Sequence, residues 1–219
     1  MFVDPHALRA RFLAHDPVHM PDWRTGDRRR PAGVVVPLFT RDRLRTVVTV
    51  RPRTLSTHPG EICFPGGRPE GDESLEAAAL REANEELGLA SMEIVGRLGS
   101  IPLLNSDHRL HAFVALAPEQ PLRPAPDEVE AVVEIDLEEA LATPHLPALS
   151  YQLGEREGIS PIFELGDGIL FGASAHVLYI VLSVVASMVG RSMPPMVTGA
   201  YRWDIAARRP VIVEPGAAG

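Results

Sequence analysis

The sequence is poor in cysteine: Cys63 is the only one among 219 residues. A single cysteine can form neither an intramolecular disulfide nor a thiolate cage around a structural metal. A secretory signal would need an apolar stretch near the N-terminus, and the first residues, with Asp4, Pro5 and His6, lead into no such stretch. Both absences are typical of a protein of the reducing cytoplasm, which is the location we expect.

Positive charge is also in short supply. The chain carries 29 acidic against 21 basic side chains, for a net charge of −8 and a pI of about 5.5. A protein that binds duplex DNA needs a basic face to release counterions, so we expect no nucleic-acid partner. A small anionic substrate remains compatible with this charge, because a bound Mg²⁺ ion supplies positive charge locally.

No segment is long and apolar enough to indicate a membrane span. The longest uncharged stretch runs from Gly168 to Gly190, and glycine and serine interrupt it at Gly172, Ser174 and Ser183. A spanning helix needs about 20 consecutive apolar residues. We therefore predict a buried helix over residues 173–189 and no membrane partner. A helix that is apolar on most of its surface is also suited to a homodimer contact.

Hydrophobic periodicity predicts alternating strands and helices along the chain. Helices are expected at residues 4–15, 73–87 and 173–189, with a helical turn at 137–141. Strands are expected at residues 33–39, 44–50, 92–101, 110–117 and 129–135, with two or three short ones between 149 and 171 and an extended flap after 192. Asp72 is the predicted N-cap of the second helix and Gly88 its C-terminal stop.

Three carboxylates lie on one side of that second helix. Glu82 and Glu86 are one turn apart, and Glu85 lies on the adjoining edge. Like charges at this spacing destabilise an isolated helix by about 0.2–0.5 kcal/mol per pair. A hard divalent cation, which prefers oxygen ligands, would offset that repulsion. An acidic face exposed to water is the alternative explanation, and for these residues alone it is the commoner one.

Arg81 has acidic neighbours of its own in the same helix. Glu85 follows it by one turn, and Glu73 precedes it by about two turns on a similar bearing. We therefore expect Arg81 to orient the acidic side chains by contacts with them, without binding the ion itself.

The wider window separates the two explanations. Gly67 and Glu73 stand upstream of the Arg81–Glu86 run, and Gly88-Leu89 follows it. This spacing resembles the Nudix box, G-x5-E-x7-R-E-U-x-E-E-x-G-U, in which U is a bulky apolar residue; Ala83 is smaller than the usual residue at the first U. The resemblance to the Nudix hydrolase family implies an α/β/α sandwich with a mixed β-sheet. It also divides the chain into an N-terminal helix and basic loop at 1–31, a Nudix domain at 32–190 and a C-terminal extension at 191–219.

The segment before the box resembles the extra signature of the coenzyme A pyrophosphatase branch, T-x-R-(S/A)-x3-R-x3-G-x3-F-P-G-G. Thr49, Arg51, Gly60 and the run 64–67 match in register. Pro52 replaces the small residue, and Ser56 replaces the second arginine. Another diphosphate, such as ADP-ribose or a dinucleotide, therefore remains an alternative substrate, and a Nudix module that senses a nucleotide without cutting it is a third reading.

The resemblance also implies roles for individual residues. The activity it implies is hydrolysis of the pyrophosphate bond of a nucleoside-diphosphate-linked substrate. Coenzyme A or acyl-coenzyme A is the leading candidate for that substrate, and Mg²⁺ or Mn²⁺ is the expected metal ion. The expected metal ligands are Glu82, Glu86, Glu85 and Gly67. The expected catalytic residues are Glu85, Arg81, Glu73 and Glu128. The expected substrate-binding residues are Arg51, Arg53 and His58. Glu128 is equally well explained as a surface acid, and His58 by a hydrogen bond within its own loop.

Overall fold

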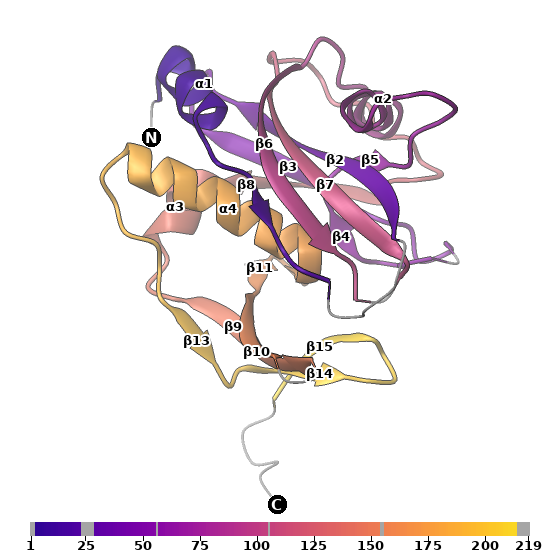
Figure 1. Ribbon diagram of the computed structural model, residues 1–219, viewed down its shortest axis with the longest axis vertical. Helices are drawn as coiled ribbons and strands as arrows, with labels where there is room; N and C mark the ends of the chain where they lie inside the picture. The colour runs from indigo at the N-terminus through magenta and orange to yellow at the C-terminus, as the bar shows by residue number, and fades with distance from the viewer. Residues whose placement is uncertain (1–2, 23–28, 56, 105, 154–155, 214–219) are drawn as a thin grey trace, which may run out of the picture.

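The computed structural model describes residues 3–22, 29–55, 57–104, 106–153 and 156–213. A mixed sheet lies between two helical layers, with α2 (Leu75–Leu87) on one face and α1 (Pro5–Leu13) and α4 (Gly172–Met188) on the other (Figure 1). This arrangement confirms the predicted α/β sandwich. Each face of the sheet has its own apolar core, the larger one beneath α1 and α4.

The large sheet contains eight strands. Its order is β1 (Val18–His19), β6 (Glu93–Pro102), β7 (His108–Leu116), β2 (Arg30–Phe39), β3 (Arg45–Val50) and β4 (Ile62–Cys63), with β5 (Gly66–Gly67) paired to β2 and β8 (Ala131–Asp136) paired to β3. The β1–β6 and β2–β7 pairs are parallel and the others antiparallel. From Ala32 to Phe39 every residue of β2 is buried, because β2 lies inside the sheet and helices cover both of its faces.

The helix α2 begins two residues later than its sequence suggests. Ser74 is the N-cap, and its hydroxyl accepts a hydrogen bond from the Ala77 amide at 3.1 Å. The prediction of Asp72 as the cap, with Glu73 inside the first turn, is therefore wrong, because a serine closer to the apolar run satisfies the free amide. Gly88 ends the helix as predicted, with a φ of 69° that favours glycine.

The second major helix, α4, is buried between the large sheet and the C-terminal half of the chain. Its inward positions, among them Val177, Val181 and Val185, are fully buried. Within the described parts of the chain, no helix is long and apolar enough to cross a membrane.

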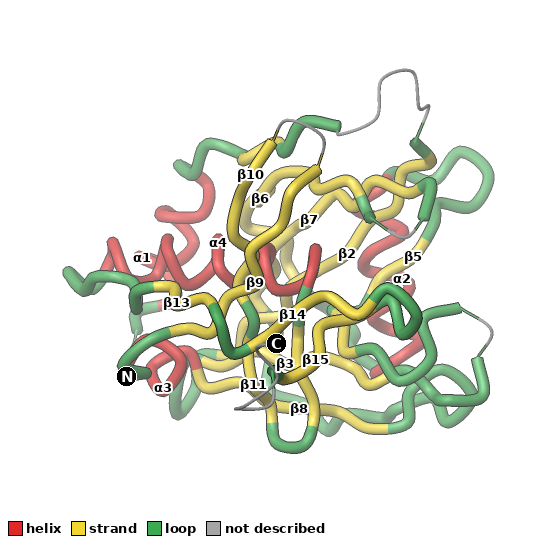
Figure 2. The backbone as a smooth tube through the Cα atoms, turned by 90° about the horizontal axis from the view of Figure 1, so that it is seen from below, coloured by secondary structure: helices red, strands yellow, loops and turns green. Residues whose placement is uncertain are grey.

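The C-terminal half adds short strands on the α4 side of the molecule. A three-stranded sheet contains β9 (Leu146–Leu153), β10 (Arg156–Pro161) and β13 (Met196–Thr198); α3 (Leu137–Ala142) precedes it, and β11 (Phe163–Leu165) pairs with β12 (Gly168–Leu170). Four strands thus occupy residues 146–170, where the sequence pattern predicted two or three. The hairpin of β14 (Tyr201–Asp204) and β15 (Arg209–Ile212) lies against β9 (Figure 2).

Candidate active site

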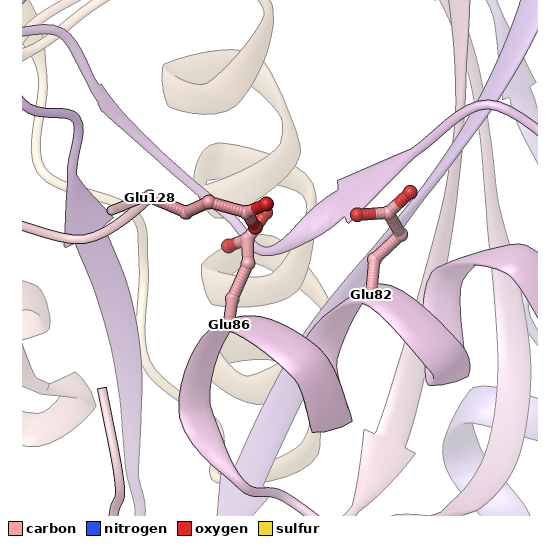
Figure 3. Close-up of side chains that lie close together, drawn as sticks. All are labelled: Glu82, Glu86 and Glu128. Atoms are coloured by element: carbon pink, nitrogen blue, oxygen red, sulfur yellow. The ribbon is translucent and has the colours of Figure 1, made fainter. Parts of the chain in front are cut away.

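Three glutamates meet beside the last two turns of α2. Glu82 and Glu86 point to the same side of the helix, and Glu128 reaches them from a separate loop (Figure 3). One carboxylate oxygen from each lies within 4.8 Å of the others. Glu86 is only 5% exposed, whereas Glu128 is exposed to solvent. The helix spacing predicted the first pair, and the structure brings to it Glu128, which the family resemblance names as a catalytic candidate.

Backbone hydrogen bonds bring Glu128 to this position. The Arg123 amide donates to the Leu87 carbonyl at 2.8 Å, and the Ala125 amide donates to the Glu86 carbonyl at 2.9 Å. The Glu128 amide then donates to the Ala125 carbonyl at 3.0 Å. The loop therefore satisfies the free carbonyls at the C-terminal end of α2 and carries Glu128 back over the helix.

The surroundings of Glu82 and Glu86 disfavour the charged form of both carboxyl groups. Burial raises the pKa of Glu86 to about 8; the Gly66 amide and Arg51 oppose that rise, while the Glu82 and Glu128 carboxylates add to it. Burial likewise raises the pKa of Glu82. Buried polar atoms are normally hydrogen-bonded, yet Oε2 of Glu86 has no hydrogen-bond partner among the described residues.

This donor set fits a hard divalent cation. It offers only carboxylate oxygens, which Mg²⁺ and Mn²⁺ prefer, and the buried oxygen of Glu86 lacks the partner that a cation would provide. Gly67 borders the cluster, because a Cβ atom added to it would lie 2.1 Å from Oε1 of Glu82. The role of the Gly67 carbonyl as a further ligand stays a prediction.

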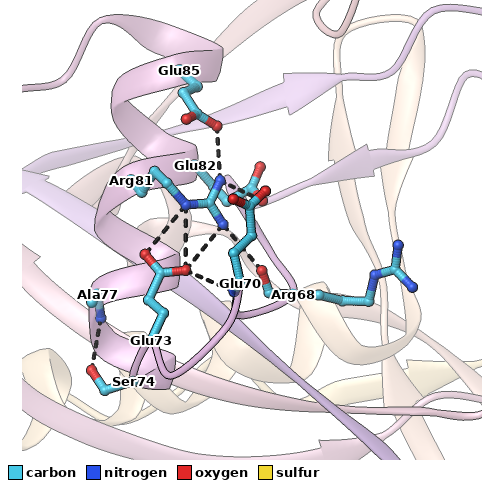
Figure 4. Close-up of polar contacts among 8 residues, drawn as sticks. All are labelled: Arg68, Glu70, Glu73, Ser74, Ala77, Arg81, Glu82 and Glu85. Carbon is cyan, nitrogen blue, oxygen red and sulfur yellow. Dashed lines mark hydrogen bonds and ion pairs between the residues drawn. The ribbon is translucent and has the colours of Figure 1, made fainter.

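Arg81 connects four groups on the other side of Glu82 (Figure 4). Its Nε donates to both carboxylate oxygens of Glu73 at 3.2 and 3.3 Å, and its Nη1 donates to Glu82 at 3.1 Å and to Glu85 at 2.9 Å. Its Nη2 donates to the Arg68 carbonyl at 3.1 Å. Hydrogen bonds from Arg81 lower the pKa of Glu73, and the carboxylates in turn raise the pKa of Arg81. Arg81 thus holds Glu82 in place and ties the loop before α2 to the helix.

Glu85 lies apart from the three-glutamate cluster. Its side chain is 52% exposed and pairs with Arg81. Among the described residues, the side chains close enough together to hold one ion are those of Glu82, Glu86 and Glu128, and Glu85 is not one of them. Its role as a metal ligand or general base stays a prediction.

The three predicted substrate-binding residues occupy different environments. Arg51 is half-buried, and its Nε has no acceptor within the described structure. His58 lies 2.9 Å from Glu61 through Nδ1, which is the loop contact considered as its alternative role. Arg53 is exposed, and its amide donates to Glu130 at 3.2 Å. Ser56, the departure from the coenzyme A signature, lies outside the described residues.

A cavity of about 570 Å³ adjoins the cluster. Gly66 and Arg51 line it, and both also act on the pKa of Glu86. The far walls include Ile162, Phe171 and Trp203. The sequence pattern did not single these residues out as functional, because an apolar wall assembled from distant segments has no spacing of its own.

Comparison with known proteins identifies the fold's relatives. The profile of the NUDIX domain matches residues 29–153. An uncharacterised Nudix hydrolase, NudL, from Cronobacter sakazakii is 35% identical over 135 residues, which cover 60% of this chain and 70% of that protein. The NudL protein from an Enterobacter species is 36% identical over 116 residues, covering 52% of this chain and 60% of that protein. The crystal structure of a MutT/nudix family protein from Enterococcus faecalis covers 87% of this chain and 81% of that one, with 16% identity and a TM-score of 0.45.

Proposed function

The chain belongs to the NUDIX domain family, and on that premise we propose that it hydrolyses the diphosphate bond of coenzyme A or an acyl derivative of it, with Mg²⁺ as the ion and Mn²⁺ as the alternative. The observation that carries this proposal is the approach of Glu82, Glu86 and Glu128 to within 4.8 Å of one another beside a substrate-sized cavity. Small-molecule sites typically have volumes of about 300–1,000 Å³, and this cavity lies in that range.

Each group in the proposed site has a separate task. Glu82 and Glu86 would hold the divalent cation, which when bound neutralises the oxygens of the diphosphate. Arg51 lines the cavity beside Glu86 and binds phosphate oxygens by charge-assisted hydrogen bonds. Arg81 keeps Glu82 oriented through the contacts described above.

Water is the proposed nucleophile. It attacks one phosphorus, the bridging P–O bond breaks, and the water proton passes to a carboxylate, for which exposed Glu128 is our candidate. The nearby thiol is unsuited to the attack, because burial raises the pKa of Cys63 to about 11 and keeps it protonated at neutral pH.

The assignment to coenzyme A is supported by the run from Thr49 to Gly67. Three of its residues that match the coenzyme A signature, Arg51, Phe64 and Gly66, line the cavity.

The test is a product screen by mass spectrometry on a panel of diphosphates with Mg²⁺ and with Mn²⁺. Coenzyme A should release 4'-phosphopantetheine. If the protein cleaves ADP-ribose or a dinucleotide but not coenzyme A, the proposed substrate is wrong and the proposed hydrolysis of a diphosphate bond stands. Binding of the ion without cleavage of any diphosphate would instead indicate a sensing module.

A substitution tests the site itself. Glu86→Gln should lower Mg²⁺-dependent turnover by about 10²-fold or more, because it removes a carboxylate ligand from the cluster. Glu76→Gln is the matched control, since Glu76 lies on the same helix but pairs with Arg97 instead. Full activity of the Glu86 variant, with an unchanged melting temperature in both, would remove Glu86 from the site.

A further inference from the structure

The cavity beside the cluster is lined by a few charged side chains and by a larger number of apolar ones. Its charged lining residues, Arg51, His58 and Glu61, all belong to the segment that leads into β5. The remaining wall is largely apolar and includes Leu149 and Ile162 from the C-terminal half of the chain. A ligand that fills this space therefore needs a charged group near Arg51 and an apolar group beyond it.

Two polar side chains of the cavity wall, His176 and Ser160, already have partners. His176 contacts the Gly172 carbonyl at 2.9 Å through Nδ1, and the Ser160 hydroxyl lies 3.5 Å from the same nitrogen. Burial lowers the pKa of His176, so its imidazole is neutral at neutral pH. This part of the wall thus presents no charge to a ligand, which favours an apolar group over a second phosphate.

The β14–β15 hairpin contributes two residues to this apolar wall. Trp203 packs edge-to-face on Phe171, with ring centroids 6.3 Å apart and an interplanar angle of 69°, and both rings line the cavity. Pro210, on the opposite strand of the hairpin, is buried and lines it too. The Tyr201 hydroxyl donates to Glu164 at 2.7 Å and anchors the hairpin to β11.

The turn of the hairpin also lies near a charged lining residue, His58. Arg208, in the turn between its strands, is close enough to His58 to oppose the rise in the pKa of that imidazole. One short element therefore borders both the loop that carries Arg51 and the apolar wall.

We propose that the β14–β15 hairpin is the specificity element of this enzyme, and that Trp203 and Pro210 bind the apolar chain of a substrate whose diphosphate lies at the glutamate cluster. This inference rests on the proposed function for the position of the diphosphate. It goes beyond that function by naming how the enzyme would distinguish one diphosphate from another: the acyl chain of the substrate would pack against the hairpin.

The first experiment compares kcat/KM for coenzyme A with that for acetyl-, butanoyl- and octanoyl-coenzyme A. Burial of a methylene group is worth about fourfold, so kcat/KM should rise by up to about that factor per methylene until the cavity is full. Trp203→Ala should lower the ratio of octanoyl-coenzyme A to coenzyme A by about tenfold or more, because it removes the largest side chain of the hairpin wall. Ile205→Ala is the matched control: Ile205 lies in the same hairpin, is 86% exposed and does not line the cavity. It should leave the ratio unchanged.

The second experiment measures binding without turnover. In a Glu86→Gln background, calorimetry should show tighter binding of octanoyl-coenzyme A than of coenzyme A, and Trp203→Ala should remove that difference. Trp203→Phe keeps an aromatic ring and should restore most of it, which separates the loss of the ring from any general loosening of the hairpin. Melting temperatures establish that each variant is folded.

The outcomes distinguish the two proposals. If wild-type protein cleaves coenzyme A but neither chain length nor Trp203 changes the ratio, the hairpin does not select the substrate and the proposed reaction stands. If no coenzyme A derivative is cleaved, yet octanoyl-coenzyme A binds in a Trp203-dependent way, the reaction is wrong and the apolar site stands.

Discussion

Gly67 and Glu82 approach so closely that no side chain fits between them. A Cβ atom on Gly67 would lie 2.1 Å from Oε1 and 2.4 Å from Cδ of Glu82. Pairing with Gly33 of β2 fixes the backbone of Gly67, so the glutamate side chain would have to move. Because Gly67 has no side chain, the Glu82 carboxylate can occupy the space beside it and thus take its place in the cluster.

Gly67→Ala should weaken binding of Mn²⁺ by about 10–100-fold. The fold should survive, because the atom in the way is the end of a flexible side chain. Electron paramagnetic resonance measures Mn²⁺ affinity, and a thermal melt measures stability. Gly71→Ala is the control: nothing lies within 4 Å of its added Cβ, but its φ of +53° disfavours alanine. That variant should lose about 1 kcal/mol of unfolding free energy and keep its Mn²⁺ affinity. The reverse pattern would contradict the role given to Gly67.

Arg81→Lys should reduce both Mn²⁺ affinity and turnover by about 10–100-fold. Lysine keeps the positive charge but cannot span Glu73, Glu82 and Glu85 with a planar fork of donors. Calorimetric titration with Mn²⁺ checks the affinity independently of activity. Arg97→Lys provides the comparison, because Arg97 pairs with Glu76 on the surface, and it should change neither quantity. Equal effects of the two substitutions would mean that Arg81 acts only through general charge.

Glu128→Gln should lower kcat by about 10²–10⁴-fold, the usual contribution of a general base. Asp127 is the neighbouring acid on the same loop and is exposed, so Asp127→Asn should leave kcat unchanged. Mn²⁺ titration separates two roles for Glu128: a base leaves the affinity intact, and a ligand lowers it. If the Glu128 variant keeps the wild-type kcat, Glu128 takes no part in catalysis despite its proximity to Glu82 and Glu86.

His58 and Glu61 should make stability depend on pH. The Glu61 carboxylate raises the pKa of His58 above 6.5, against opposing effects of burial, Arg51 and Arg208. The folded-state pKa is thus above the unfolded value. The pair stabilises the fold fully below pH 6.5, and that contribution disappears as pH rises through the folded-state pKa.

Glu61→Gln should therefore lower the free energy of unfolding at acidic pH and change it little at alkaline pH. The pair is partly exposed, so the difference should stay below about 1 kcal/mol. Urea unfolding at about pH 5.5 and about pH 9 measures it, on either side of the histidine range. A larger effect at the alkaline pH would contradict this sign.

The site could be predicted from sequence wherever one helix carries it. Glu82 and Glu86 are four residues apart, and so are Arg81 and Glu85, so periodicity alone places each of these two pairs on a common side of α2. The position of Glu128 depends instead on loop amides that bind the carbonyls of Glu86 and Leu87, a tertiary contact without a sequence pattern. For the same reason, an exposed Glu85 cannot be told from its buried neighbour Glu86 by spacing.

The fold shows a similar division. The sequences of strands β2, β3, β6 and β7 are either continuously apolar or alternate between apolar and polar residues. Their predicted ends therefore lie close to the observed ones. The start of α2 was misplaced because Asp72 and Ser74 are both good caps, and only the structure shows which hydroxyl or carboxylate meets a free amide. The wall around Trp203 could not be foreseen, because it depends on where a hairpin distant in sequence packs.

The β14–β15 hairpin lies beyond residues 29–153, the part of the chain that matches the family profile, whereas all three clustered glutamates lie within it. If the two proposals above hold, cation binding and substrate discrimination are encoded in separate stretches of the gene. Grafting at residues 201–212 would then exchange one wall of the cavity and leave the glutamate cluster intact, so substrate preference would change without loss of the proposed metal site.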